Sequence, residues 1–147
     1  MFQIFVLLAV YQLKHFLADY PLQGAYMLQK FKGGWEWVLP LVAHAGVHGL
    51  FTLVISLLVN PALWWLSLVD FVVHFTMDRI KASPNLLGRY KALSAKEFTY
   101  IFNKLGLDHP DAQAELKGNK YFWWALGLDQ AVHHLTHYVI IYVLVKG

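Results

Sequence analysis

The stretch ALWWLSLVDFVVHFTMDRIK, residues 62–81, carries the pattern that decides the fold of this chain. A membrane-spanning helix needs about 20 residues, and this stretch is that long. Asp70, His74 and Asp78 interrupt its apolar sequence at intervals of four, so a helix brings all three to one face. An ionisable side chain at the membrane centre costs about 2.5–3.5 kcal/mol. The stretch therefore predicts a transmembrane helix with one functional polar face.

Three further stretches are long and apolar enough to cross a bilayer. They cover approximately residues 2–20, 35–59 and 121–145. The turn at Asn60-Pro61 is so short that the second and third helices form an antiparallel hairpin. The sequence thus predicts an all-α membrane protein, in which residues 1–147 form a single domain built as a four-transmembrane-helix bundle.

The composition agrees with a membrane protein and excludes several kinds of chemistry. Hydrophobic residues make up 58% of the chain and charged residues only 14%. The absence of cysteine excludes disulfides, cysteine-ligated metals and thiol nucleophiles. A net charge of +3 is too small to indicate a nucleic-acid partner.

The basic residues orient the predicted helices. Eight of the twelve lie between Arg79, at the end of the third helix, and Lys120, two follow the first helix, and none lies in the Asn60-Pro61 turn. The positive-inside rule then places both basic loops in the cytoplasm and both termini outside. Within the long cytoplasmic loop, about residues 82–120, a capping box at Ser94–Glu97 precedes a helical apolar pattern from Phe98 to Leu105. This pattern predicts an amphipathic helix on the inner membrane surface.

Each predicted transmembrane helix carries a polar set with the same spacing of four residues. The sets are His15 and Asp19, then His44 and His48, then Asp70, His74 and Asp78, and finally Asp129, His133 and His137. In the predicted orientation, all four sets lie within about 10–20 Å of the inner end, at a rise of about 1.5 Å per residue. His134 points away from this face, and we expect it to be structural or to support a ligand.

Four aspartates in one layer of low dielectric constant must either be protonated or bind cations. The sequence places the nearest basic residues, Lys14, Arg79 and Lys81, at the membrane edge. Two divalent ions (Zn, Mn or Fe) are therefore expected to balance the carboxylates. The expected metal ligands are His44, His48, Asp70, His74, Asp78, Asp129, His133 and His137.

Three residues are candidates for catalysis beside these ligands. His15 and Asp19 are expected to act as ligands, as support for ligands or as the general base. Lys81 is a candidate for holding an anionic substrate, and its alternative is a lysine that extends to the membrane edge. For any single histidine here, the alternatives to metal binding are hydrogen-bonded packing and a proton relay.

Several motifs resemble those of a known family. They are HFLADYPLQ at residues 15–23, Lys30, the pair His44 and His48, HFTMDRIK at 74–81, and LDQAVH at 128–133. These motifs are similar to a family of small bacterial and phage membrane proteins, domain of unknown function three-three-zero-seven. The resemblance implies a bacterial inner-membrane or phage-encoded protein and singles out the same polar residues, but it implies no activity. More distantly, the residue types and spacing resemble LexA-regulated membrane-bound metal-dependent hydrolases, which favours hydrolysis.

The sequence therefore predicts a membrane-embedded metal-dependent hydrolase that acts on a lipid or lipid-linked (phospho)ester from the cytoplasmic side. A diiron-type desaturase or hydroxylase is an alternative, because His44/His48 and His133/His137 resemble the histidine boxes of those enzymes. Four aspartates are many for such a histidine-dominated site. A metal or proton transporter is the second alternative. The nearly apolar outer halves of the helices favour one-sided access over transport.

Overall fold

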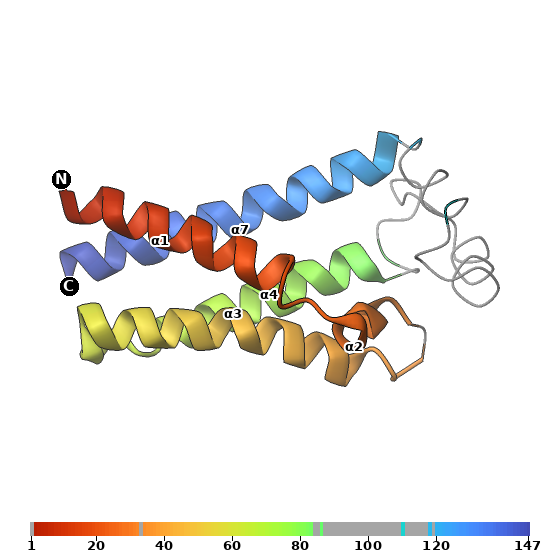
Figure 1. The fold of residues 1–147 in the computed structure, drawn as a ribbon, viewed down its shortest axis with the longest axis horizontal. Helices are drawn as coiled ribbons and strands as arrows, with labels where there is room; N and C mark the ends of the chain where they lie inside the picture. The colour runs from red at the N-terminus through yellow and green to blue at the C-terminus, as the bar shows by residue number, and fades with distance from the viewer. Residues whose placement is uncertain (1, 33, 84–85, 87–109, 111–117, 119) are drawn as a thin grey trace.

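The computed structural model is made of helices, without strands, in the residues that it describes, which are 2–32, 34–83, 86, 110, 118 and 120–147. Its long helices lie side by side (Figure 1) and are α1 (Phe2–Asp19), α3 (Val38–Val59), α4 (Leu66–Ala82) and α7 (Lys120–Lys146). Short helices α2 (Ala25–Leu28) and η1 (Gln29–Phe31) connect α1 to α3, and η2 (Pro61–Leu63) connects α3 to α4. The amphipathic helix predicted around Phe98 lies outside the described residues.

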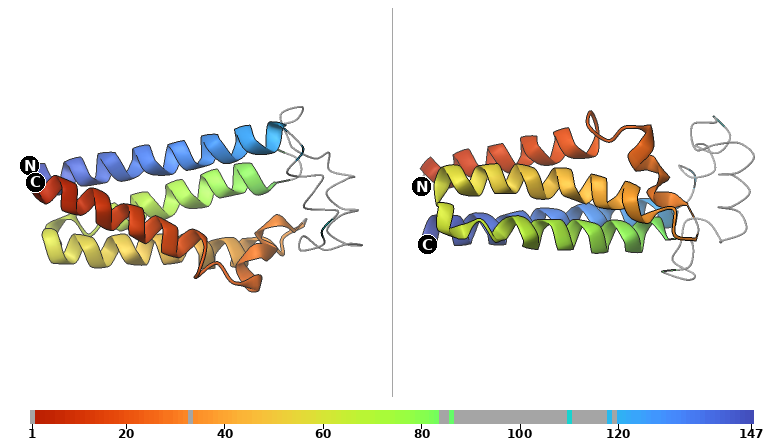
Figure 2. Two further views of the ribbon diagram at one scale, coloured as in Figure 1. Left: turned by 45° about the horizontal axis from the view of Figure 1, so that its top comes forward. Right: turned by 90° about the horizontal axis from the view of Figure 1, so that it is seen from below.

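The helices pack as a bundle with α4 between two neighbours. One side of α4 packs against α3, with which it forms the predicted hairpin, and the other side packs against α7. The bundle is closed by α1, which packs against both α3 and α7 (Figure 2). Both chain termini and the η2 turn lie at one end, which we name the terminus end. The start of α7, the end of α4 and the short helices α2 and η1 lie at the other end, the loop end.

The hairpin begins its second helix later than the sequence indicated. The predicted helix started at residue 62, whereas α4 starts at Leu66. The Asn60 side chain accepts a hydrogen bond of 3.1 Å from the backbone N–H of Ala62, and this cap starts a separate 3-10 turn at Pro61. Close contact between the two helices depends on Gly49, because a Cβ there would lie 3.1 Å from the Ser67 carbonyl oxygen.

The two halves of the interior differ in polarity. The core of the terminus end is apolar and consists of Leu7, Tyr11, Leu66, Ile140, Ile141 and Leu144. Toward the loop end the buried side chains are histidines, aspartates and lysines. Ionisable groups so deeply buried are rare in proteins unless they are paired or bind an ion.

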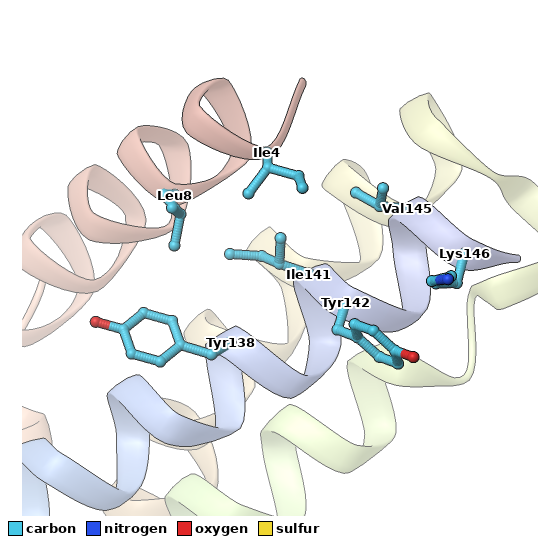
Figure 3. A pocket seen from close by; sticks show the side chains of 7 residues that line it. All are labelled: Ile4, Leu8, Tyr138, Ile141, Tyr142, Val145 and Lys146. Atoms are coloured by element: carbon cyan, nitrogen blue, oxygen red, sulfur yellow. The ribbon is translucent and has the colours of Figure 1, made fainter. Parts of the chain in front are cut away.

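The exterior of the bundle is apolar. Large hydrophobic side chains are exposed along all four long helices, with Phe2 83% exposed on α1 and Leu58 82% exposed on α3. A groove of about 270 Å³ also opens on this surface between α1 and α7 (Figure 3). It is lined by Ile4, Leu8, Tyr138, Ile141, Tyr142, Val145 and Lys146.

One of the described helices, α3, is long and apolar enough by itself to cross a membrane. The sequence predicted four such spans. By contrast, α4 has 17 residues, and two aspartates, an arginine and a lysine interrupt its apolar sequence. Length and composition therefore establish a candidate span in α3, and the other three spans stay a prediction.

Candidate metal centre

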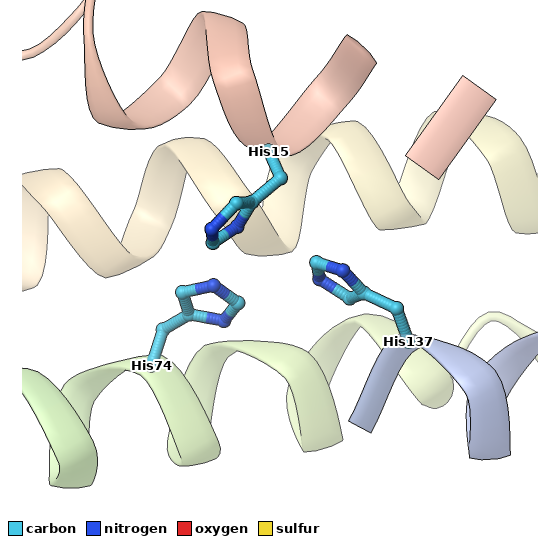
Figure 4. A group of neighbouring side chains, drawn as sticks. All are labelled: His15, His74 and His137. Atoms are coloured by element: carbon cyan, nitrogen blue, oxygen red, sulfur yellow. The ribbon is translucent and has the colours of Figure 1, made fainter. Parts of the chain in front are cut away.

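The ten polar residues that the sequence singled out meet in the interior of the bundle. They come from all four long helices, and nine of them are at most 4% exposed. The tenth, Asp19, has a side chain that is 13% exposed. Figure 4 shows His15, His74 and His137 reaching toward one another from α1, α4 and α7. The four-residue spacing in each helix thus produced one shared polar core.

Three imidazole rings from three helices form a stack in this core. The ring centroids of His48 and His74 are 3.7 Å apart, and those of His74 and His133 are 3.9 Å apart. The planes of both pairs are nearly parallel, at 25° and 15°. Because these rings come from α3, α4 and α7, the stack is a direct side-chain contact that joins these three helices in the interior of the bundle.

The Asp19 carboxylate is the point on which imidazole nitrogens converge. Its Oδ1 lies 3.0 Å from Nε2 of His48 and 3.4 Å from Nε2 of His44. Its Oδ2 lies 3.2 Å from Nε2 of His15. The donor atoms of Asp19, His44 and His48 all lie within 4.8 Å of one another. Such a mixed set of imidazole and carboxylate donors suits Zn, Mn or Fe(II).

Further groups of donor atoms are equally close. They are His15 with Asp19 and His133, His15 with His74 and His137, and Asp78 with Asp129 and His133. Within the described residues, neither ring nitrogen of His133 has a hydrogen-bond partner, and Oδ1 of Asp129 also lacks one. Buried polar atoms without a partner are costly, and a water molecule, a substrate group or an ion would satisfy them. The residues present therefore fit a metal ion.

Lys14 lies inside the polar core, so its predicted place at the membrane edge was wrong. It is only 2% exposed, and its Nζ lies 2.6 Å from Oδ2 of Asp70 and 3.1 Å from Nε2 of His137. The Thr52 hydroxyl donates a 2.7 Å hydrogen bond to the same Asp70 oxygen. The physical reason is helical spacing, because Tyr11, Lys14 and Ala18 all lie on the buried face of α1.

Lys30 also enters the core, although it belongs to the connector between α1 and α3. Its Nζ donates to Oδ2 of Asp78 and to Oε1 of Gln23, at 2.9 Å in each case. The short helix η1 packs against both α3 and α4, and this packing carries the lysine to Asp78. Burial lowers the pKa of the Lys30 ammonium, and the Asp78 carboxylate opposes that shift.

Lys81 lies against two of the predicted ligands. Its Nζ is 3.0 Å from Oδ1 of Asp78 and 2.6 Å from Oδ2 of Asp129. An anionic substrate held by Lys81 would therefore share the ammonium with two carboxylates. The sequence left two interpretations of Lys81, a group that holds an anionic substrate or a lysine that extends to the membrane edge. The structure places it at the loop end of the core, with its side chain 22% exposed.

Two glutamines support the core from its edge. Gln130 contacts Nε2 of His15 at 2.9 Å through its oxygen and donates to Oδ2 of Asp19 at 3.4 Å. Nε2 of Gln12 lies 3.2 Å from Nδ1 of His134, whose ring is 4.9 Å from that of His15. His134 therefore lies at the edge of the core, beside the ring of His15. Sequence reasoning missed Thr52, Gln130 and Lys30 as site residues, although the family motifs contain the latter two.

The fold and the site define a class, which is a helical bundle whose described residues contain one candidate membrane span and a buried histidine–aspartate cluster able to hold a metal ion. The chain belongs to the family described as "Protein of unknown function (DUF3307)", whose model matches residues 6–146. This match confirms the resemblance seen in the motifs. No curated protein and no solved structure matches the chain. The similarity to LexA-regulated hydrolases stays a prediction.

Proposed function

We propose that this protein is an integral membrane, metal-dependent hydrolase that cleaves a lipid or lipid-linked phosphoester or ester reached from the cytoplasmic side. The observation that carries the proposal is the convergence of His44 and His48 on the Asp19 carboxylate inside an apolar bundle. When bound there, a divalent ion acidifies water and neutralises negative charge that develops on an ester. The steps below argue the membrane, the chemistry and the substrate in turn.

The exposed apolar surface supports four membrane spans. Soluble monomers seldom expose large contiguous apolar patches, yet all four long helices expose theirs. The core aspartates and histidines that lower the hydropathy of α1, α4 and α7 face the interior, away from lipid. The apolar exterior and the polar core are what a lipid-embedded bundle needs.

Single-cysteine labelling tests these spans and their orientation, because the natural chain contains no cysteine. Ala62→Cys marks the terminus end and Glu36→Cys marks the loop end. In intact bacteria, a membrane-impermeant maleimide is expected to label Ala62→Cys at once and Glu36→Cys only after permeabilisation. Labelling of both residues from the same side, or recovery of the chain in the soluble fraction, contradicts the proposed topology.

The chemistry of the core favours hydrolysis over redox catalysis. The core contains four aspartates, which are many for the histidine-dominated sites of membrane diiron desaturases and hydroxylases. His133 is our candidate for the general base, because its ring nitrogens are unpaired within the described residues and its Nε2 lies 3.9 Å from Oδ1 of Asp129. In this proposal His15 and Gln130 orient Asp19, and Lys81 holds Asp78 and Asp129 in place.

A lipid substrate is favoured by the groove between α1 and α7. Leu8 and Tyr138 in the groove lie one helical turn from Gln12 and His134, which contact each other at 3.2 Å. The groove thus ends one helical turn from the Gln12–His134 contact at the edge of the polar core. From Ile4 to His15 the rise is about 16 Å, which is enough for a long acyl or prenyl chain. At the terminus end the core is apolar, which disfavours passage of an ion to the outer side of the membrane. This apolar core argues against transport.

Hydrolysis is tested with the purified full chain in liposomes of phosphatidylethanolamine and phosphatidylglycerol, with phosphatidic acid or a polyprenyl diphosphate as probes. Release of phosphate or fatty acid is measured with Zn²⁺ or Mn²⁺ and with a chelator. We expect metal-dependent release that Asp19→Asn lowers by more than the roughly 10–100-fold that loss of a supporting residue costs. Release that persists in chelator contradicts metal dependence, and Zn²⁺ uptake into the liposomes without any release indicates transport.

A further inference from the structure

We infer that the polar core is built for one divalent ion, held by Asp19, His44 and His48, and that the Lys14 ammonium takes the place of a second ion beside Asp70. This inference rests on the metal centre proposed above and deepens it. It replaces the two ions expected from the sequence, because that expectation assumed that no lysine reaches the carboxylates.

Lysines already neutralise three of the four core carboxylates. Asp70 pairs with Lys14 at 2.6 Å, Asp78 pairs with Lys30 at 2.9 Å, and Asp129 pairs with Lys81 at 2.6 Å. Within the described residues, the ion pairs of Asp19 are with His15, His44 and His48 alone. Asp19 is therefore the carboxylate whose negative charge is left for an added cation.

The charge balance of the core favours one ion over two. Four carboxylates and three lysines leave one net negative charge when the histidines are neutral. One divalent ion brings the core to one net positive charge, and a singly charged phosphoester would neutralise it. Two divalent ions would bring the core to three positive charges. In an interior of low dielectric constant, such an excess is costly.

The Asp70 layer has the composition of a second metal site, but Lys14 occupies it. Oδ1 of Asp70 lies 3.2 Å from Nδ1 of His74 and 3.3 Å from Nε2 of His137. The Lys14 ammonium contacts two of these three residues, with Nζ at 2.6 Å from Asp70 and 3.1 Å from His137. Within the described residues, Asp70 belongs to none of the groups in which three donor atoms lie within 4.8 Å of one another, whereas Asp19 belongs to two of them.

Metal stoichiometry tests the inference without any assay of activity. The detergent-purified full chain is loaded with Zn²⁺ alone, dialysed, and analysed for zinc per chain by mass spectrometry. We expect one zinc for the wild type and less than a tenth for Asp19→Asn. For Lys14→Met we expect two, because Asp70, His74 and His137 lose the cation that competes with zinc and their donor atoms can then close around a second zinc ion.

A paired variant keeps the test decisive if Lys14→Met does not fold. Lys14→Met/Asp70→Asn removes both charges of the pair, and we expect it to keep one zinc. Two zinc ions in the wild type, one in a folded Lys14→Met chain, or none in the double variant overturns the inference and leaves the proposed metal centre standing. No zinc in the wild type overturns the proposed metal centre itself, so the two failures are distinguishable.

Discussion

The two ends of the bundle are held together by different forces. At the terminus end, Leu7, Ile140 and Leu144 form an apolar core with no buried ion pair among them. At the loop end, buried aspartates lie 2.6–2.9 Å from lysines and are surrounded by imidazoles. Side-chain packing stabilises the first region wherever atoms meet closely. The second region is stable only while every buried charge has its partner.

This difference indicates at which end of the bundle a functional site is expected. A polar core costs desolvation energy that an apolar core of the same volume does not, and replacing buried ion pairs by hydrophobic residues is often stabilising. The same four helices form both regions, so the fold alone does not require the charges. We therefore propose that the loop end exchanges stability for an ability to bind ions and anionic groups, while the terminus end supplies the stability.

The largest effect is expected from loss of a core carboxylate. Asp78→Ala leaves the Lys30 ammonium buried without its carboxylate, and breaking a buried pair costs about 3–5 kcal/mol. The free energy of unfolding of the metal-free chain is measured by titration with a denaturing detergent. Glu36→Ala is the control, because its ion pair with Lys32 is exposed and is worth less than about 1 kcal/mol. Equal losses for the two variants contradict the dependence of the loop end on its buried ion pairs.

A smaller effect is expected from a cavity at the terminus end. Ile140 is fully buried, and Ile140→Ala is expected to cost about 2–3 kcal/mol, in the lower part of the range for such truncations because lipid is itself apolar. Zinc per chain is expected to stay at the wild-type value. Val139→Ala, at the neighbouring exposed position, serves as the matched control and should change neither quantity. A loss of zinc in Ile140→Ala would show that the two regions are not independent.

The smallest effect tests the helix contact that both regions share. An added Cβ at Gly49 meets the Ser67 carbonyl oxygen at 3.1 Å and Cβ of Phe71 at 3.2 Å, so Gly49→Ala is expected to cost about 1–2 kcal/mol. A Cβ at Gly46 meets nothing within 4 Å. Gly46→Ala should therefore be neutral or stabilise the helix by up to about 1 kcal/mol. Thermal unfolding of both variants measures the difference, and the reverse order contradicts the packing of α3 against α4.

The sequence predicted the helical bundle and the convergence of its polar residues because both follow from local spacing. Four-residue intervals fix a helix face, and the cost of placing charges on an apolar exterior turns that face toward the interior. His44, Asp70 and His133 are buried in one core as expected. The short Asn60-Pro61 turn likewise determined the hairpin of α3 and α4.

The charge balance of the site could not be predicted in the same way. Lys14 was treated as a residue of the membrane edge because of its charge, although it shares a helix face with Tyr11 and Ala18. Lys30 lies in a connector, and no periodicity indicates where a connector folds back against a bundle. Its contact with Asp78 spans 48 positions of the chain and depends on tertiary packing. These two lysines changed the expected number of ions.

The most direct test of the account is the X-ray absorption spectrum of the zinc-loaded wild-type chain at the zinc edge. We predict a shell that contains at least two imidazole nitrogens, at about 2.0–2.1 Å, together with carboxylate oxygen. Asp19→Asn should abolish the signal of bound zinc. A shell made of oxygen alone, or a chain that retains no zinc after dialysis, contradicts the claim that His44, His48 and Asp19 gather around a metal ion.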